Sequence, residues 1–153
     1  DREHARRVLL DQTHQCAARL RAADLRCRVA VLKARGADFT TVTRSRTLAA
    51  PTDLAQDIWE TVASLYSALP SPPGGFRLLG VRVEGLLRPD DGVQLLLDED
   101  PRRGASERAA DAVRRKWGAH ALAPASLLPG DGAARTPIDE VRRPGQDDAS
   151  RTQ

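Results

Sequence analysis

The sequence is poor in cysteine and has no long hydrophobic run, and each shortage excludes a class of protein. Its two cysteines, Cys16 and Cys27, have no histidines at ligand spacing, which excludes a zinc site and predicts reduced, partly buried thiols in the cytoplasm. No apolar run approaches the roughly 18 residues of a membrane-spanning helix. Residues 1–10, DREHARRVLL, lack a methionine and the apolar centre of a signal peptide, and a first residue Asp1 indicates a fragment or a processed chain.

Positive charge is concentrated at the start of the chain. Of the 153 residues, the first 50 carry 11 Lys and Arg against 5 Asp and Glu, a net +6, whereas residues 51–153 carry 13 against 16, a net −3. A basic half on a protein of net charge +3 indicates a polyanionic partner. The length and the hydrophobic content of 41% fit one domain with a modest core, with or without a tail.

The spacing of apolar residues predicts helix, strand, strand, helix and strand, in that order. Helical spacing recurs in 1–22 and in 52–69, the second helix beginning at a Thr52 or Asp53 cap. The two apolar stripes are Leu10, Thr13, Ala17 and Leu20, then Leu54, Ile58, Val62, Leu65 and Leu69. Alternation predicts strands over 26–35, 39–48 and 76–88, of which the first two form a hairpin.

The rest of the chain is predicted to hold a short apolar run over 93–100 and a short helix over 105–117 that ends at Gly118. Residues 129–153 are polar and rich in glycine, proline and charge, which predicts a disordered tail. The folded domain is therefore expected to span residues 1–128.

This order of elements predicts an α+β fold of two layers, in which two helices cover one face of an antiparallel-rich sheet. Alternation places Ala30, Leu32 and Ala34 toward the helices. The other face is expected to be uncovered and basic. Its predicted basic side chains are Lys33, Arg35, Arg44, Arg46 and Arg82.

Residues 39–48, FTTVTRSRTL, combine five hydroxyl side chains with two arginines, and no acid follows before Asp53. Phosphate oxygens accept hydrogen bonds from arginine and hydroxyl groups whatever the base. Short side chains, and Gly80 on a neighbouring strand, also let the backbone approach closely. With only 3% aromatic residues for stacking, the pattern predicts binding to a duplex backbone without sequence readout. A solvent-facing strand is the competing interpretation.

Two motifs, ADFTTVTRSRTL (37–48) and FRLLGVRVEGL (76–86), resemble the little finger domain of Y-family DNA polymerases of the DNA polymerase IV type. The segment AADAVRRKWGAHALAPASLL (109–128) is similar to the C-terminal end of actinobacterial members. The resemblance implies a sheet backed by two helices, in β-α-β-β-α-β order, that lies across the DNA major groove during error-prone translesion synthesis. The implied DNA contacts are Lys33, Arg35, Thr43, Arg44, Ser45, Arg46, Thr47, Arg77 and Arg82, beside Gly80. The DNA contact of Arg77 is implied by the resemblance alone, since alternation places this side chain on the apolar face of Leu79.

The chain departs from this family pattern in two ways. It begins in the first helix, so the first strand is missing, and it has no palm with the paired carboxylates that hold Mg²⁺. The resemblance therefore implies a nucleotidyltransferase as the parent protein, with no catalysis and no cofactor in this chain. The implied partners are duplex primer–template DNA and the rest of the polymerase, with no membrane, and the chain is expected to be a monomer.

Gln94, Leu95 and Leu97 resemble the Gln-Leu-x-Leu core of the peptide that bacterial polymerases dock into the sliding clamp. Leucines in an extended segment can fill an apolar groove on such a partner. The favoured alternative is an ordinary edge strand or a segment that covers the core. The aromatic residue that usually ends the peptide is missing, since Asp98 follows Leu97.

Two further functions compete with the polymerase accessory domain. One is a non-catalytic, polymerase-like repair subunit that keeps this fold as an interaction module. The other is an independent nucleic-acid-binding regulator, although the sequence has no helix-turn-helix features. Metal-binding acids in a palm domain upstream of Asp1 would decide for the enzyme.

Overall fold

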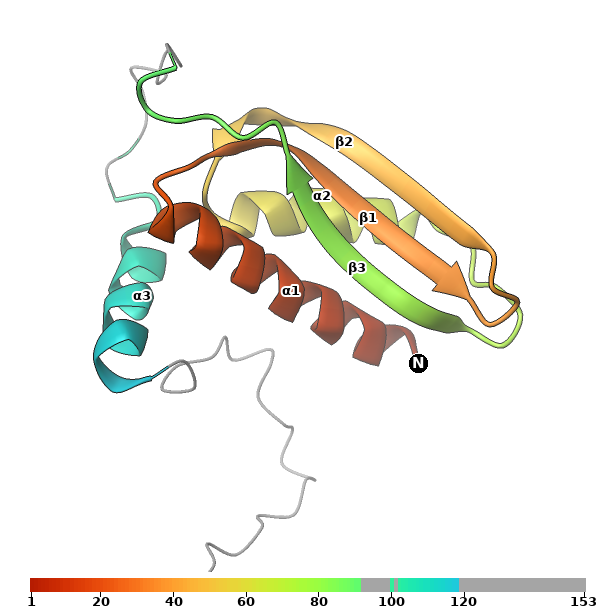
Figure 1. Ribbon diagram of the computed structural model, residues 1–153. Helices are drawn as coiled ribbons and strands as arrows, with labels where there is room; N and C mark the ends of the chain where they lie inside the picture. The colour runs from red at the N-terminus through yellow and green to blue at the C-terminus, as the bar shows by residue number, and fades with distance from the viewer. Residues whose placement is uncertain (92–99, 101, 119–153) are drawn as a thin grey trace, which may run out of the picture.

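The computed structural model describes residues 1–91, 100 and 102–118. The helices and strands along the chain are α1 (Arg2–Ala22), β1 (Cys27–Gly36), β2 (Thr41–Thr52), α2 (Ala55–Ser67), β3 (Phe76–Glu84) and α3 (Ala105–Trp117) (Figure 1). The strands form one antiparallel sheet in the order β2-β1-β3. The predicted order of elements is confirmed. Of the apolar run predicted over 93–100, only residue 100 is described. The predicted tail, residues 129–153, lies outside the described residues.

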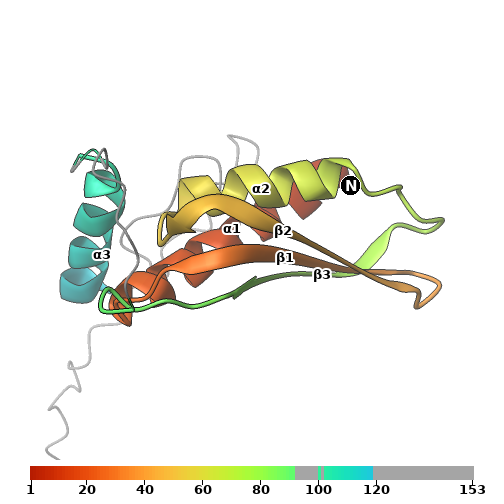
Figure 2. The same ribbon diagram turned by 90° about the horizontal axis from the view of Figure 1, so that it is seen from above.

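Helices α1 and α2 lie side by side on one face of the sheet, and among the described residues no helix covers the other face (Figure 2). This arrangement is the expected two-layer α+β fold. Within the described residues no helix is both long and apolar enough to cross a bilayer.

The hydrophobic core lies between the sheet and the two helices. Ala30 and Leu32 of β1 are fully buried there, as their alternation predicted. The stripe predicted for α2 is buried throughout. In α1 the predicted Thr13, Ala17 and Leu20 are buried, but Leu9 is buried in place of the predicted Leu10, which is only partly buried. The buried hydroxyl of Thr13 donates to the carbonyl of Leu9 at 2.8 Å, so this polar group is satisfied inside the core.

The start of α2 differs from the prediction. Thr52 ends β2, and its hydroxyl accepts from the Leu54 amide at 3.1 Å and donates to Asp57 at 2.6 Å, so it caps no helix. The N-cap position is Leu54, whose side chain makes no capping bond. The Ala55 amide instead donates to a carboxylate oxygen of Glu107, on α3, at 2.9 Å. A residue distant in the sequence therefore caps this helix.

Helix α3 is attached mainly through charged groups. None of its residues is buried, yet Glu107 and Asp111 each lie 2.5 Å from the guanidinium of Arg21, whose side chain is only 7% exposed. Burial alone would lower the pKa of Arg21, but the hydrogen bond to Asp111 and the nearby carboxylates raise it, so the charge persists. The helix ends at Gly118, as predicted, with φ of 101°.

Candidate nucleic-acid interface

The uncovered face of the sheet is defined by pairs across the three strands. Directly paired residues of antiparallel strands point to the same side. Lys33 on β1 lies between Thr43 on β2 and Gly80 on β3. The neighbouring rows, written β2 to β3, are Thr41–Arg35–Leu78, Ser45–Val31–Arg82 and Thr47–Val29–Glu84. The structure thus brings together most of the predicted site residues.

Gly80 is not required by the fold of this chain. A Cβ built on it would meet no atom within 4 Å, and its φ is not in the left-handed region. Glycine in a strand interior weakens the strand and often marks a place where another backbone or a ligand approaches. Here it leaves the main chain of β3 open beside Lys33.

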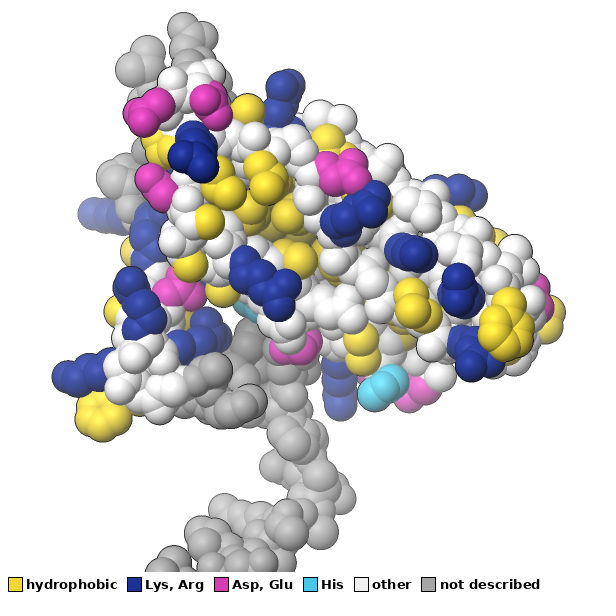
Figure 3. Space-filling model, viewed as in Figure 1, with side chains coloured by type: hydrophobic (Ala, Val, Ile, Leu, Met, Phe, Trp, Pro, Cys, Tyr) yellow, Lys and Arg dark blue, Asp and Glu magenta, His cyan; other side chains and the backbone are white. Residues whose placement is uncertain are grey.

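The charge of the uncovered face is unevenly distributed. Lys33 is exposed, and Arg35 donates to the hydroxyl of Thr41 at 2.9 Å. Arg82 and Glu84 form an ion pair at 2.5 Å in which both side chains stay largely exposed, so the pair is weak. The positive end of the face is therefore the end near the β1–β2 turn. Figure 3 shows Lys and Arg side chains spread over this face and gathered at that end.

The prediction that Arg44 and Arg46 share this face is wrong. Arg44 pairs with Leu32 and Arg46 with Ala30, and both of these β1 residues point toward the helices. The Arg46 guanidinium accordingly donates to the hydroxyl of Ser64 on α2 at 3.0 Å. Both arginines stay exposed because β2 is an edge strand, but they leave it on the helix side.

The expectation that Arg77 shares the face of Leu79 is also wrong. Arg35 pairs with Leu78 and Gly36 with Phe76, so Arg77 is the extra residue of a β-bulge. Its exposed guanidinium lies 4.4 Å from the ring centroid of Phe39. The sequence prediction treated Phe39 as the first residue of a strand, but it belongs to the turn between β1 and β2.

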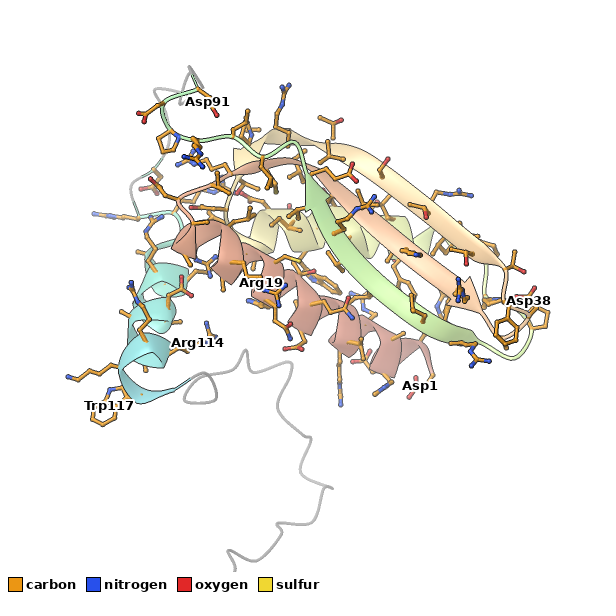
Figure 4. The ribbon with its side chains drawn as sticks, viewed as in Figure 1. Asp1, Arg19, Asp38, Asp91, Arg114 and Trp117 are labelled. Atoms are coloured by element: carbon orange, nitrogen blue, oxygen red, sulfur yellow. The ribbon has the colours of Figure 1, made fainter. Side chains whose placement is uncertain are left out.

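That turn is held by hydrogen bonds around Asp38, which Figure 4 labels at the far end of the sheet from α3. The Asp38 carboxylate accepts from the amide of Thr40 at 3.0 Å and from its hydroxyl at 2.5 Å. These hydrogen bonds from Thr40 lower the pKa of Asp38. Such an Asx turn was readable in the sequence Asp-Phe-Thr and is the signal that could have placed Phe39 in the turn.

The described residues contain no group of three or more His, Cys, Asp or Glu side chains that could hold a metal ion. Asp91 accepts from the amide of Arg88 at 2.9 Å, in the segment that follows β3. Cys27 is fully buried, and burial raises the pKa of its thiol to about 12, so it remains protonated near neutral pH. The candidate clamp residues Gln94, Leu95 and Leu97 lie outside the described residues.

Comparison with known proteins identifies the domain. Residues 1–97 match the impB/mucB/samB family C-terminal domain. Proteins named DNA polymerase IV are 40% identical over 105 residues in Caulobacter vibrioides, 49% over 72 in Streptomyces coelicolor and 34% over 143 in Brucella melitensis. These alignments cover 67%, 47% and 90% of this chain, but only 26%, 15% and 32% of the relatives.

The spread of these organisms does not bear out an actinobacterial assignment, whereas the resemblance to the C-terminal domain of a Y-family polymerase is confirmed. The match to the family covers well over half of the chain. The chain therefore belongs to the impB/mucB/samB family, and residues 1–97 match the C-terminal domain of that family.

Proposed function

We propose that this domain binds the backbone of duplex DNA without reading its sequence, as the little finger of an error-prone translesion DNA polymerase. Its relatives are named DNA polymerase IV, and the chain spans about a quarter of the length of the first of them. Nucleotide transfer and the Mg²⁺ that it needs then belong to the rest of the polymerase. The domain binds the backbone of the primer–template. It acts as a monomer in the cytoplasm.

The observation that carries this proposal is the row of Thr43, Lys33 and Gly80 across the sheet. A cationic side chain stands there between a hydroxyl donor and an open stretch of main chain. Phosphate oxygens accept hydrogen bonds from all three kinds of group, and none of these contacts distinguishes one base from another. Within the described part of the chain, the space around Gly80 would accommodate a side chain, so packing does not require a glycine there.

The neighbouring rows extend the same chemistry along the sheet. Arg35 and Arg82 add guanidinium groups, which form paired, charge-assisted hydrogen bonds with phosphate. Ser45 and Thr47 add hydroxyls on the same side. Arg44 and Arg46 leave β2 on the other side, so any phosphate that they bind lies beyond the edge of the sheet.

Fluorescence anisotropy with two labelled duplexes of unrelated sequence tests the proposal. If about three or four phosphates are neutralised, the logarithm of the association constant should fall with the logarithm of salt concentration at a slope of about −3 to −4. Both duplexes should give the same affinity and slope. A flat salt response, or a strong preference for one sequence, would overturn backbone binding.

A further inference from the structure

Phe39 is a large apolar side chain that the core does not use. It is 62% exposed at the turn between β1 and β2. Leu78, which pairs with Arg35 at the same end of the uncovered face, is 44% exposed. The apolar surface at this end of the sheet is bordered by the basic residues of the face.

The backbone holds Phe39 in a conformation that phenylalanine rarely adopts. Its φ is 67°, in the left-handed region, where a side chain with a Cβ is strained. The Phe39 amide donates to the carbonyl of Gly36 at 3.0 Å, and the Gly36 amide donates to the carbonyl of Thr40 at 2.9 Å. Asp38 completes the turn through both of its bonds to Thr40. Strain of this kind persists where surrounding hydrogen bonds hold it, and it is frequent at functional sites.

A second planar group lies over the ring. The bulge in β3 frees Arg77 from strand pairing, and the central carbon of its guanidinium lies 4.4 Å from the Phe39 ring centroid. Aromatic rings and guanidinium planes are the two side-chain groups on which unpaired nucleobases stack. The pair therefore forms a small, positively charged stacking platform on a turn whose backbone is held by hydrogen bonds.

We propose that Phe39 and Arg77 stack an unpaired base of the strand that continues from the duplex held on the uncovered face. This inference rests on the proposed function and adds a single-stranded contact to it. The base must be unpaired because bases inside a duplex have both faces occupied by their neighbours. The contact accepts any sequence, since every base has a π face.

The test compares a blunt duplex with the same duplex carrying a single-stranded overhang, using the full 153-residue chain. Phe39→Ala should weaken binding of the overhang DNA by between about fivefold and a hundredfold, the range for the loss of one base–aromatic stack. Binding of the blunt duplex should change by less than about twofold, because the phosphate contacts remain. A 2-aminopurine in the overhang should be quenched on binding by the unchanged chain and not by Phe39→Ala.

Two further variants distinguish base stacking on the ring from a contact that needs only an apolar side chain. Phe39→Leu keeps an apolar side chain without a π face and should lose affinity for the overhang as Phe39→Ala does. Trp117→Ala removes another exposed aromatic, at the end of α3, and should change nothing. If Phe39→Ala leaves both DNAs equally well bound, base stacking is overturned and the proposed duplex grip stands. A Phe39 contact with another protein would give that same result. If the unchanged chain binds no DNA, both proposals fail.

Discussion

Arg21 on α1 and Glu107 on α3 face each other with 2.5 Å between a guanidinium nitrogen and a carboxylate oxygen. The same carboxylate accepts from the Ala55 amide, at the start of α2. One side chain from α3 therefore connects the C-terminal end of α1 with the N-terminal end of α2. This contact, rather than apolar packing, fixes α3 on the domain, since none of the residues of α3 is buried.

Glu107→Ala should lower the free energy of unfolding by about 2 kcal/mol, because a buried guanidinium loses a partner and a helix loses its cap. Hydrogen exchange of the Ala55 amide should speed up at the same time. Glu3→Gln is the matched control, since its ion pair with Arg7 is exposed, and its effect should stay within about 0.5 kcal/mol. Unchanged exchange at Ala55 in the Glu107 variant would contradict this role.

Phe39→Asn should leave the free energy of unfolding unchanged or raise it by up to about 1 kcal/mol, because asparagine tolerates a positive φ better than phenylalanine does. Phe39→Val places a β-branched residue in the same conformation and should destabilise the fold. Urea unfolding curves of both variants provide the measurement. A loss of stability in the asparagine variant as large as in the valine variant would show that the ring itself supports the fold.

The stability of the domain should fall at alkaline pH because of Cys27. Burial raises the pKa of this thiol from its ordinary value of 9.0 to about 12, so between these values only the unfolded chain loses the proton. The contribution is fully present below about pH 9 and is lost as the pH rises toward 12. Urea unfolding at about pH 8 and about pH 10 should show a smaller drop in Cys27→Ala than in the unchanged chain. Equal drops would contradict this assignment.

Gly80→Val should preserve the fold and weaken duplex binding. Its Cβ has open space and valine favours strands, so stability should stay the same or rise by about 1 kcal/mol. The branched side chain would keep a DNA backbone away from the main chain. Gly85→Val is the contrasting variant, since Gly85 has φ of 65° and a Cβ there would lie 3.1 Å from that of Arg28, and this change should destabilise the domain. Duplex affinity of Gly80→Val equal to that of the unchanged chain would argue against close approach.

The sequence predicted the faces of β1 and β3 because their apolar residues alternate. Ala30, Leu32 and Ala34 mark the buried side of β1, and Leu79 and Val81 mark that of β3. The apolar residues of β2 over TVTRSRTL are Val42 and Leu48, and both pack on the core. Alternation from these two places Arg44 and Arg46 on the helix side, a signal that the sequence prediction did not use. The pairing of β2 with β1 shows the same placement.

The other two errors originate in contacts between residues that are distant in the sequence. The sequence predicts a local Thr52 or Asp53 cap, but the carboxylate that accepts from the Ala55 amide belongs to Glu107, 52 residues away. The bulge at Arg77 depends on how β3 pairs with Gly36 at the end of β1. Neither signal exists within a short stretch of sequence.

DNA binding through the uncovered face is tested most directly by two double variants that remove the same amount of charge. Lys33→Gln with Arg35→Gln removes two positive charges from the uncovered face, and Arg44→Gln with Arg46→Gln removes two from the helix side. Duplex affinity at one fixed salt concentration should fall at least about tenfold in the first variant and clearly less in the second, while both unfold at the same temperature as the unchanged chain. Equal losses in the two variants, or a larger loss in the second, would contradict binding through the uncovered face.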